Sequence, residues 1–361
     1  LQHQDHVIID HFDVVEFQKR ITHGCLPHTV RQAVKSGLGL AAARLDAFFS
    51  CECSGIFLDQ RPGHIGHGRD PVGHNLVVIP LPFLQQHGGD NRRLAVDKIE
   101  IVGLRELDKL DIEIFDGQEV MELARAIKNE DEINAMRCSL ASTEIAMAKM
   151  QQASVPGATE NDIWAVLHAE NIKRGGEWIE CRLLASGPRT NPWFQESGPR
   201  VVQNVELLAF DTDLIGPYGI CADISRTWMI GDAEPTAEQR RLYRVAYDHI
   251  QHNMEILRPG MTFEEVTRAG VRLPEEFRAQ RYGVMMHGVG LCDEYPSIRY
   301  PEDLEGHGYS GVLEPGMALC VEAYVGAVGG KEGVKLEDQV IITENGFENL
   351  TSYPFEEALL K

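Results

Sequence analysis

Five carboxylate side chains are embedded among apolar residues in segments that read as buried strands, and they constrain the fold more than any other feature. The segments read VELLAFDTDLI, GICADISRTWMI, GMALCVEAYVG and GVKLEDQVIITENGFENLT. The carboxylates in them are Asp211, Asp213, Asp223, Glu322 and Glu337. Asp211 and Asp213 are two residues apart, so in a strand both point to the same face. An unpaired buried charge costs several kcal/mol, so these side chains need partners.

Two accounts of the carboxylates are open. Arg226 and Lys335 can pair with some while strand ends expose others, or the group can hold metal. Five carboxylates, with His287 as a sixth ligand, favour the metal. Oxygen-rich coordination with one imidazole suits Fe, Mn, Co or Zn and argues against a thiolate zinc site. Six ligands exceed the need of one tetrahedral ion, and carboxylates commonly bridge two metals about 3.5–4 Å apart, so we predict a dinuclear centre.

Composition narrows the class of partner. The chain has 361 residues, which suggests two domains or one large domain with an extension. A formal charge of −21 would repel nucleic acid and anionic membranes, which leaves a small molecule or metal. The eight cysteines are scattered, as expected for free thiols in a reducing cytoplasm. There is no 18-residue apolar run and no charged-then-apolar leader, so we expect neither a membrane span nor secretion.

The order of helical and strand patterns predicts an α+β domain. Residues 94–104 indicate a strand followed by a turn, and a long amphipathic helix starts at Lys128 to Glu132, near a domain boundary. Thr159 and Thr262 each follow a Pro-Gly pair and have an acidic residue three positions later, which predicts two capping boxes. Alternating apolar residues and an Asn-Gly turn predict antiparallel strands towards the end of the chain.

The run ADISRT, HGVG, EPGMALCVE and GVKLEDQVIITENGFENLT resembles the pita-bread metallopeptidase family of aminopeptidase P, prolidase, methionine aminopeptidase and creatinase. The resemblance implies a pita-bread catalytic domain over 127–361 and a smaller N-terminal α/β domain over 1–126. By motif it makes Asp223, His287, Glu322 and Glu337 metal ligands. The first aspartate ligand comes from DTD. Family peptidases separate their first two aspartate ligands by eleven residues, whereas Asp213 and Asp211 lie ten and twelve residues before Asp223. Both are therefore expected to coordinate.

Two departures from the peptidase pattern fall on residues that handle protons. The loop ASGPRTNPWFQ has Trp193 where the peptidases carry a histidine. The stretch MMHGVGLCDEYP reads as a strand that enters an active-site turn, but it is one residue shorter than the family motif, and Asp293 takes the position of a second histidine. Both hydrolase histidines are therefore absent while every metal ligand is kept.

Proton abstraction next to a carboxylate, followed by loss of a β-leaving group, fits these departures. Metals on the substrate carboxylate would stabilise the enolate-like charge, and Asp293 would act as general base. Trp193, with Tyr282 or Tyr295, could hold a cationic leaving group by cation–π attraction of about 0.5–2 kcal/mol. Each aromatic can equally be a packed core residue.

The stretches FDTDLIGPYGICADISRTWMIGD, MHGVGLCDEYP and KLEDQVIITENGFENLTSYPF are similar to one branch, the dimethylsulfoniopropionate lyases of the DddP type. The resemblance implies a homodimeric, cytoplasmic carbon–sulfur lyase that cleaves dimethylsulfoniopropionate with two metal ions, iron ahead of Zn, Mn or Co. It covers about 88–361. Residues 1–87 do not read like the family's N-terminal domain, and nine of the 14 histidines fall within the first 88 residues. Divergence, disorder or a frame disruption would each explain this.

Three hypotheses follow. The first is the lyase. The second is a Xaa-Pro peptidase or creatinase-like metallohydrolase, which most of the family favours but Trp193 and Asp293 oppose. The third is a metal-free pita-bread binding module, which the complete ligand set opposes.

Overall fold

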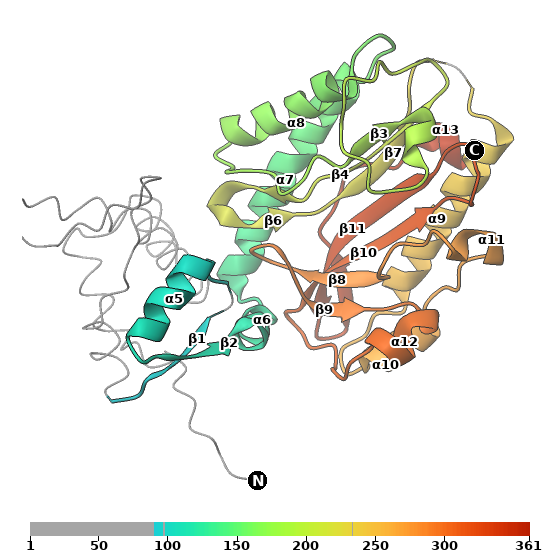
Figure 1. Cartoon of the computed structure of the whole chain (residues 1–361). Coiled ribbons are helices and arrows are strands. Elements are labelled where there is room, and N and C mark those ends of the chain that lie inside the picture. Colours follow the sequence, from blue (N-terminus) through green and yellow to red (C-terminus); the bar gives the residue numbers. More distant parts are fainter. Residues whose placement is uncertain (1–89, 97, 233) are drawn as a thin grey trace, which may run out of the picture. The chain divides into compact units, whose positions relative to one another are not determined.

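A computed structural model describes residues 90–96, 98–232 and 234–361 (Figure 1). The chain divides into two compact units, residues 1–125 and 126–361, and each is described by itself. Residues 1–87, which do not read like the family's N-terminal domain, lie outside the described residues. Among the described residues, no helix is both long enough and apolar enough to cross a bilayer.

The described part of the first unit is a small α/β element. Two parallel strands, β1 (Arg93–Val96) and β2 (Glu113–Asp116), are joined by helix α5 (Ile101–Lys109), and α6 (Gln118–Arg125) follows. A crossover helix is the usual connection between parallel strands. The predicted strand at residue 94 is confirmed, but the predicted turn is wrong beyond residue 100, because α5 already begins at Ile101.

The second unit is built on antiparallel strands, as predicted. The largest sheet has the order β12-β11-β10-β8-β9. Its strands are β8 (Met286–Val289), β9 (Asp293–Ile298), β10 (Ala318–Val325), β11 (Val334–Thr343) and β12 (Gly346–Asn349). A second sheet contains β3 (Leu184–Ser186), β4 (Leu207–Asp211) and β7 (Ser225–Met229), and a two-stranded one contains β5 (Leu214–Ile215) and β6 (Cys221–Ala222). The predicted Asn-Gly turn joins β11 to β12.

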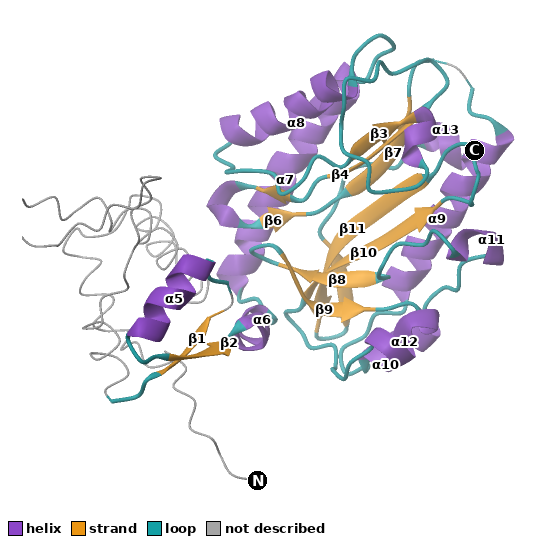
Figure 2. Ribbon diagram, viewed as in Figure 1, coloured by secondary structure: helices purple, strands orange, loops and turns teal. Residues whose placement is uncertain are grey.

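Helices lie outside these sheets (Figure 2). The longer ones are α7 (Glu130–Ala153), α8 (Glu160–Lys173) and α9 (Ala237–Glu255). The shorter ones are α10 (Phe263–Ala269), α11 (Glu275–Arg278), α12 (Leu304–His307) and α13 (Glu357–Leu360), with 3₁₀ turns at η1 (Gly187–Thr190), η2 (Pro217–Gly219) and η3 (Pro301–Asp303). One apolar core packs α7 and α8 against β4 and β7, and another packs α9 and α10 against β8, β10 and β11.

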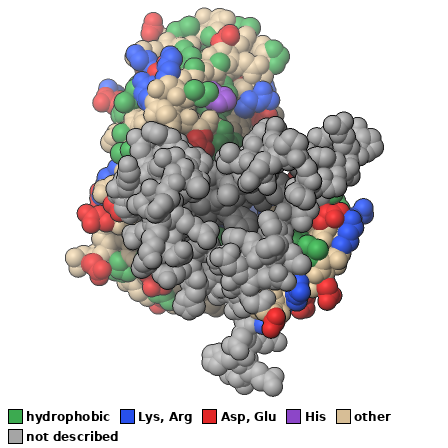
Figure 3. Space-filling model, turned by 90° about the vertical axis from the view of Figure 1, so that its left-hand side faces the viewer, with side chains coloured by type: hydrophobic (Ala, Val, Ile, Leu, Met, Phe, Trp, Pro, Cys, Tyr) green, Lys and Arg blue, Asp and Glu red, His purple; other side chains and the backbone are tan. Residues whose placement is uncertain are grey.

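Local signals set the helix starts. Thr159 and Thr262 form the two predicted capping boxes at α8 and α10, where each side chain accepts from the backbone three residues on. Asn129 forms another and begins α7 within the predicted window. These bonds satisfy N–H groups that have no partner inside the helix. On the face shown in Figure 3, acidic and basic side chains are interspersed over the described surface.

Candidate metal centre and substrate pocket

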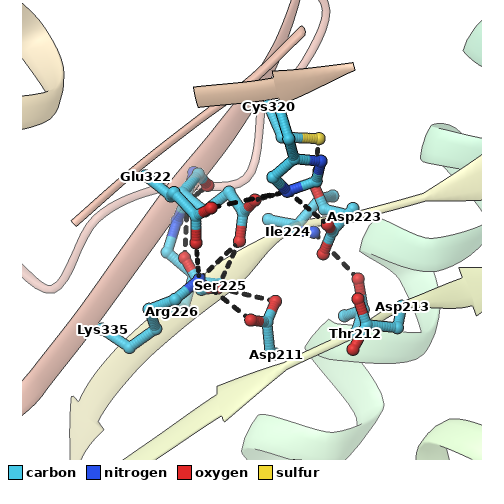
Figure 4. A network of polar contacts seen from close by, with 12 residues as sticks. Asp211, Thr212, Asp213, Asp223, Ile224, Ser225, Arg226, Cys320, Glu322 and Lys335 are labelled. Atoms are coloured by element: carbon cyan, nitrogen blue, oxygen red, sulfur yellow. Dashed lines mark hydrogen bonds and ion pairs between the residues drawn. The ribbon is translucent and has the colours of Figure 1, made fainter. Parts of the chain in front are cut away.

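The second unit brings the six predicted ligand side chains together. Their ligand atoms fall into overlapping groups, in each of which all atoms lie within 4.8 Å of one another. The groups are Asp223, His287, Cys320 and Glu337; Asp211, Glu322 and Glu337; and Asp211, Asp213 and Asp223. Figure 4 shows several of them converging from strands of different sheets. Among the described residues, five buried or partly buried carboxylates therefore meet at one site.

Strand register places four side chains of these groups on one face of the largest sheet. Glu322 on β10 is the direct partner of Glu337 on β11, and Cys320 on β10 is the partner of His287 on β8. Cys320 and Glu322 are two residues apart, so their side chains share a face. Nε2 of His287 consequently lies 3.5 Å from Oε1 of Glu322 and 3.3 Å from Oε1 of Glu337.

The aspartates come from the other side of the cluster, and one is held differently from the prediction. Strand β4 ends at Asp211, so the prediction that Asp213 shares its strand face is wrong. Asp213 has a φ of +35°, a left-handed conformation that turns the chain. Its side chain still approaches those of Asp211 and Asp223, and its Oδ2 accepts from the Cys181 thiol at 2.7 Å. A turn, not strand alternation, brings the DTD carboxylates together.

Lys335 is also a member of the cluster, and its predicted pairing with some of the carboxylates is confirmed. Its Nζ lies 2.9 Å from Oδ2 of Asp211, 2.8 Å from Oε2 of Glu322 and 2.7 Å from Oε2 of Glu337. The ammonium is fully buried. Arg226, the other counter-ion considered, pairs with Asp338 instead. The signal was present in the sequence, because Lys335 is two residues before Glu337 and so shares its strand face.

Burial and mutual repulsion dominate the electrostatics of the cluster. Burial raises the pKa of Asp223 and of Glu322 well above the ordinary value, and neighbouring carboxylates add to the shift at Asp223. Glu337 is the exception: burial raises its pKa, but the charges of Lys335 and His287 outweigh this and lower it. Even beside Lys335 the pKa of Glu322 stays raised, so this one ammonium does not offset the negative charge of all the buried carboxylates.

The polar atoms fit a bound cation. Nε2 of His287 faces Asp223, Glu322 and Glu337 at 3.3–3.5 Å, and one ring nitrogen can donate to only one of them. The buried Oδ1 of Asp223 has no hydrogen-bond partner among the described residues. Buried oxygens around a single imidazole form a donor set suited to a divalent ion of the Fe, Mn, Co or Zn type.

Asp293 lies at the edge of this cluster. Its Oδ1 is 3.9 Å from Nδ1 of His287, and 46% of its side chain is exposed, compared with 11% for His287. It belongs to none of the close groups found among the described residues. A carboxylate next to the ligands but partly open to solvent can exchange a proton with water.

Close packing of β9 against β8 explains why the HGVG motif has a glycine at position 288. The register shifts between His287 and Gly288, and a side chain at Gly288 would overlap the carbonyl oxygen of Tyr295. We expect Gly288→Ala to lower the free energy of unfolding by about 1–3 kcal/mol, as overpacking does. Urea denaturation would measure this. Gly306→Ala is the control, since an added methyl there meets nothing within 4 Å, and equal stabilities for the two variants would contradict the packing argument.

The predicted aromatic residues separate into two clusters. Trp193 is buried, stacks on Tyr324 at 5.9 Å, and packs in one cluster with Tyr282. Nζ of Lys335 lies 4.7 Å from the Tyr282 ring centroid and 6.0 Å from that of Trp193, so this cluster borders the carboxylates.

Tyr295 lies in the second aromatic cluster. It packs with Phe263 and Tyr309, at ring separations of 5.7 and 5.8 Å. Phe194 is 62% exposed and stacks on Tyr282 at 5.3 Å. Its position was not predicted from the sequence. Roles for Trp193, Tyr282 and Tyr295 in substrate binding stay predictions.

Comparison with known proteins assigns the family. The model of metallopeptidase family M24 matches residues 134–344, which include all six predicted ligands. The chain belongs to family M24. Within the family it falls in the DddP-type branch, because it is 58% identical over 283 residues to the dimethylsulfoniopropionate lyase DddP of Roseovarius nubinhibens and 54% identical over 310 residues to that of Roseobacter denitrificans.

These matches cover 77% and 84% of this chain, and 64% and 68% of the two lyases. The chain thus spans about two thirds of the length of these M24 relatives. Among solved structures, a Xaa-Pro dipeptidase from Bacillus anthracis superposes with a TM-score of 0.65 at 23% identity, over 76% of each chain. That likeness confirms the pita-bread fold of this M24 protein.

Proposed function

We propose that this chain cleaves dimethylsulfoniopropionate to acrylate and dimethyl sulfide by β-elimination. The observation that carries the proposal is the position of Asp293, half-exposed and 3.9 Å from His287, where a hydrolase would carry a histidine. The similarity to two lyases named for this substrate supports it. The chain keeps the metal-binding pattern of a peptidase and changes the group that handles the proton.

The elimination balances without a further reactant. The Asp293 carboxylate takes a proton from the carbon next to the substrate carboxylate, and that electron pair forms the new carbon–carbon double bond. The bond between the β-carbon and sulfur breaks, and its electrons leave with sulfur. The positively charged sulfonium thereby becomes neutral dimethyl sulfide, and acrylate remains. Asp293 then returns its proton to solvent, to which 46% of its side chain is open.

Two divalent metal ions, iron in first place, would be held by Asp211, Asp213, Asp223, His287, Glu322 and Glu337. When bound, the ions would stabilise the negative charge that develops on the substrate carboxylate. Charge balance supports two ions. The five carboxylates carry −5, and Lys335 with two divalent ions supplies +5.

The aromatic cluster would receive the sulfonium end of the substrate. Trp193 and Tyr282 pack together beside Lys335, within reach of a molecule held at the carboxylates. A cation over an aromatic face gains about 0.5–2 kcal/mol, more when it is desolvated. The resemblance further implies a homodimer in the cytoplasm, and both remain part of the proposal.

Headspace detection of dimethyl sulfide from the purified chain, with elemental analysis of the same sample, tests the proposal. We expect dimethyl sulfide and acrylate in equal amounts and about two metal ions per chain. Turnover of Xaa-Pro dipeptides without dimethyl sulfide would instead establish a peptidase. A metal-free preparation that stays inactive with every added metal would point to a binding module.

A further inference from the structure

A buried ion pair lies next to the turn that carries Asp293. Nζ of Lys128 donates to Oε1 of Glu294, and the two side chains are 4% and 0% exposed. Lys128 precedes α7, and its backbone N–H donates to the carbonyl of Gly316 at 2.8 Å. Glu294 is the second residue of β9. The pair therefore ties the start of this strand to a segment 166 residues earlier in the chain.

The strand alternates between buried and more exposed positions, and this couples Glu294 to Asp293. Asp293 is exposed and Glu294 is buried, as are Pro296 and Ile298. Successive side chains of a strand point to opposite faces. An anchor on the Glu294 side chain therefore sets the direction in which the Asp293 carboxylate points.

The turn before β9 packs around the carboxylate of Glu294. The N–H of Gly290 donates to the carbonyl of Cys292, and the carbonyl of Gly290 accepts from the N–H of Cys221 at 2.8 Å. A side chain at Gly290 would overlap Oε1 of Glu294, so the Glu294 carboxylate packs directly on the turn. Lys128, Glu294 and Gly290 thus form one continuous contact from the start of α7 to the turn.

We propose that the Lys128–Glu294 pair positions Asp293 for proton abstraction. The inference rests on the proposed function. Without Lys128, the buried Glu294 carboxylate would lose this cation, and it would be drawn towards water with the start of β9. Asp293 would then leave its place beside His287, while the metal-binding side chains on β10 and β11 keep theirs. Lys128 and Glu294 act through Asp293, so neither needs to touch substrate.

The test uses Lys128→Met and Glu294→Gln in the full chain, with dimethyl sulfide release measured on ordinary and α-deuterated substrate. We expect kcat to fall by about 10²-fold, the effect of a 1 Å misplacement, with KM and metal content unchanged. The deuterium isotope effect should rise, because proton abstraction becomes slower than the other steps. Lys128→Arg, which keeps the ion pair, should restore most of the rate.

A double-mutant cycle separates positioning from general destabilisation. If the pair acts through Asp293, Lys128→Met causes no further loss in an Asp293→Asn background; independent effects would multiply and overturn the inference. Met150→Ala, a large-to-small change in the α7 core, is the matched control and should lower stability while leaving kcat unchanged.

If Lys128→Met does not fold, Lys128→Arg and Glu294→Gln still decide the question. A wild-type chain that releases no dimethyl sulfide would overturn the proposed function itself, whereas an active wild type with an unaffected Glu294→Gln overturns the positioning role alone.

Discussion

Replacing Asp293 by Asn should lower kcat for dimethyl sulfide release by about 10²- to 10⁴-fold, the usual contribution of a general base. The amide is close in shape to the carboxylate but cannot accept the proton. Metal content should stay at the wild-type value, because Asp293 belongs to none of the close ligand groups among the described residues. Steady-state kinetics and elemental analysis of the same preparation would measure both effects.

Asp248→Asn is the matched control for this loss of one negative charge. Asp248 lies on α9 with 63% of its side chain exposed, and its replacement should leave activity unchanged. Asp293→Asn with wild-type activity would mean that another group removes the proton. Loss of activity together with loss of metal would mean that Asp293 is a ligand and not a base.

Replacing Lys335 by Met should strongly destabilise the metal-free chain. The Lys335 ammonium lies within 3 Å of Asp211, Glu322 and Glu337, and all four groups are buried. Removing one partner of a buried ion pair typically costs about 3–5 kcal/mol, because the remaining charge is left uncompensated. We therefore expect a loss of about this size in the free energy of unfolding, measured by urea denaturation in the presence of a chelator.

Added divalent metal should restore part of that stability, since it supplies positive charge to the same carboxylates. The gain on metal addition should be larger for Lys335→Met than for the wild type. Lys331→Met is the control, because Lys331 is exposed and its loss should change little. If Lys335→Met were as stable as the wild type without metal, the lysine would not be the charge that offsets the carboxylates.

The sequence predicted those parts of the fold and site that depend on local spacing. The capping boxes at Thr159 and Thr262 need only four consecutive residues, so both could be found without a structure. Glu322 and Glu337 are embedded among apolar residues in strand-like segments, and that setting indicates that they are buried on strands. Burial of several carboxylates then required a shared partner, which is why the ligand cluster could be predicted as a group.

Features that depend on pairing between distant segments were not predictable in the same way. The left-handed turn at Asp213 replaces the strand that alternation suggested. The register shift beside Gly288 depends on how β9 meets β8, and it determines where Asp293 lies. The contacts of Tyr295 with Phe263 and Tyr309 likewise join segments that the sequence does not relate. By contrast, the pairing of Lys335 with the carboxylates was predictable, because its spacing of two residues from Glu337 places both side chains on one face of the strand.

If Glu322 and Glu337 bind an ion together, as we propose, their facing positions would link ion binding to correct folding. The two carboxylates are direct partners across β10 and β11, and a slip of one residue would turn one strand's entire set of side chains to the opposite face. A chain that paired these strands out of register would therefore separate the two glutamates by the thickness of the sheet. An ion that needs both would bind only the correctly paired hairpin. Metal binding would then stabilise only the native pairing of β10 and β11. By mass action it would shift the equilibrium away from chains with the wrong register.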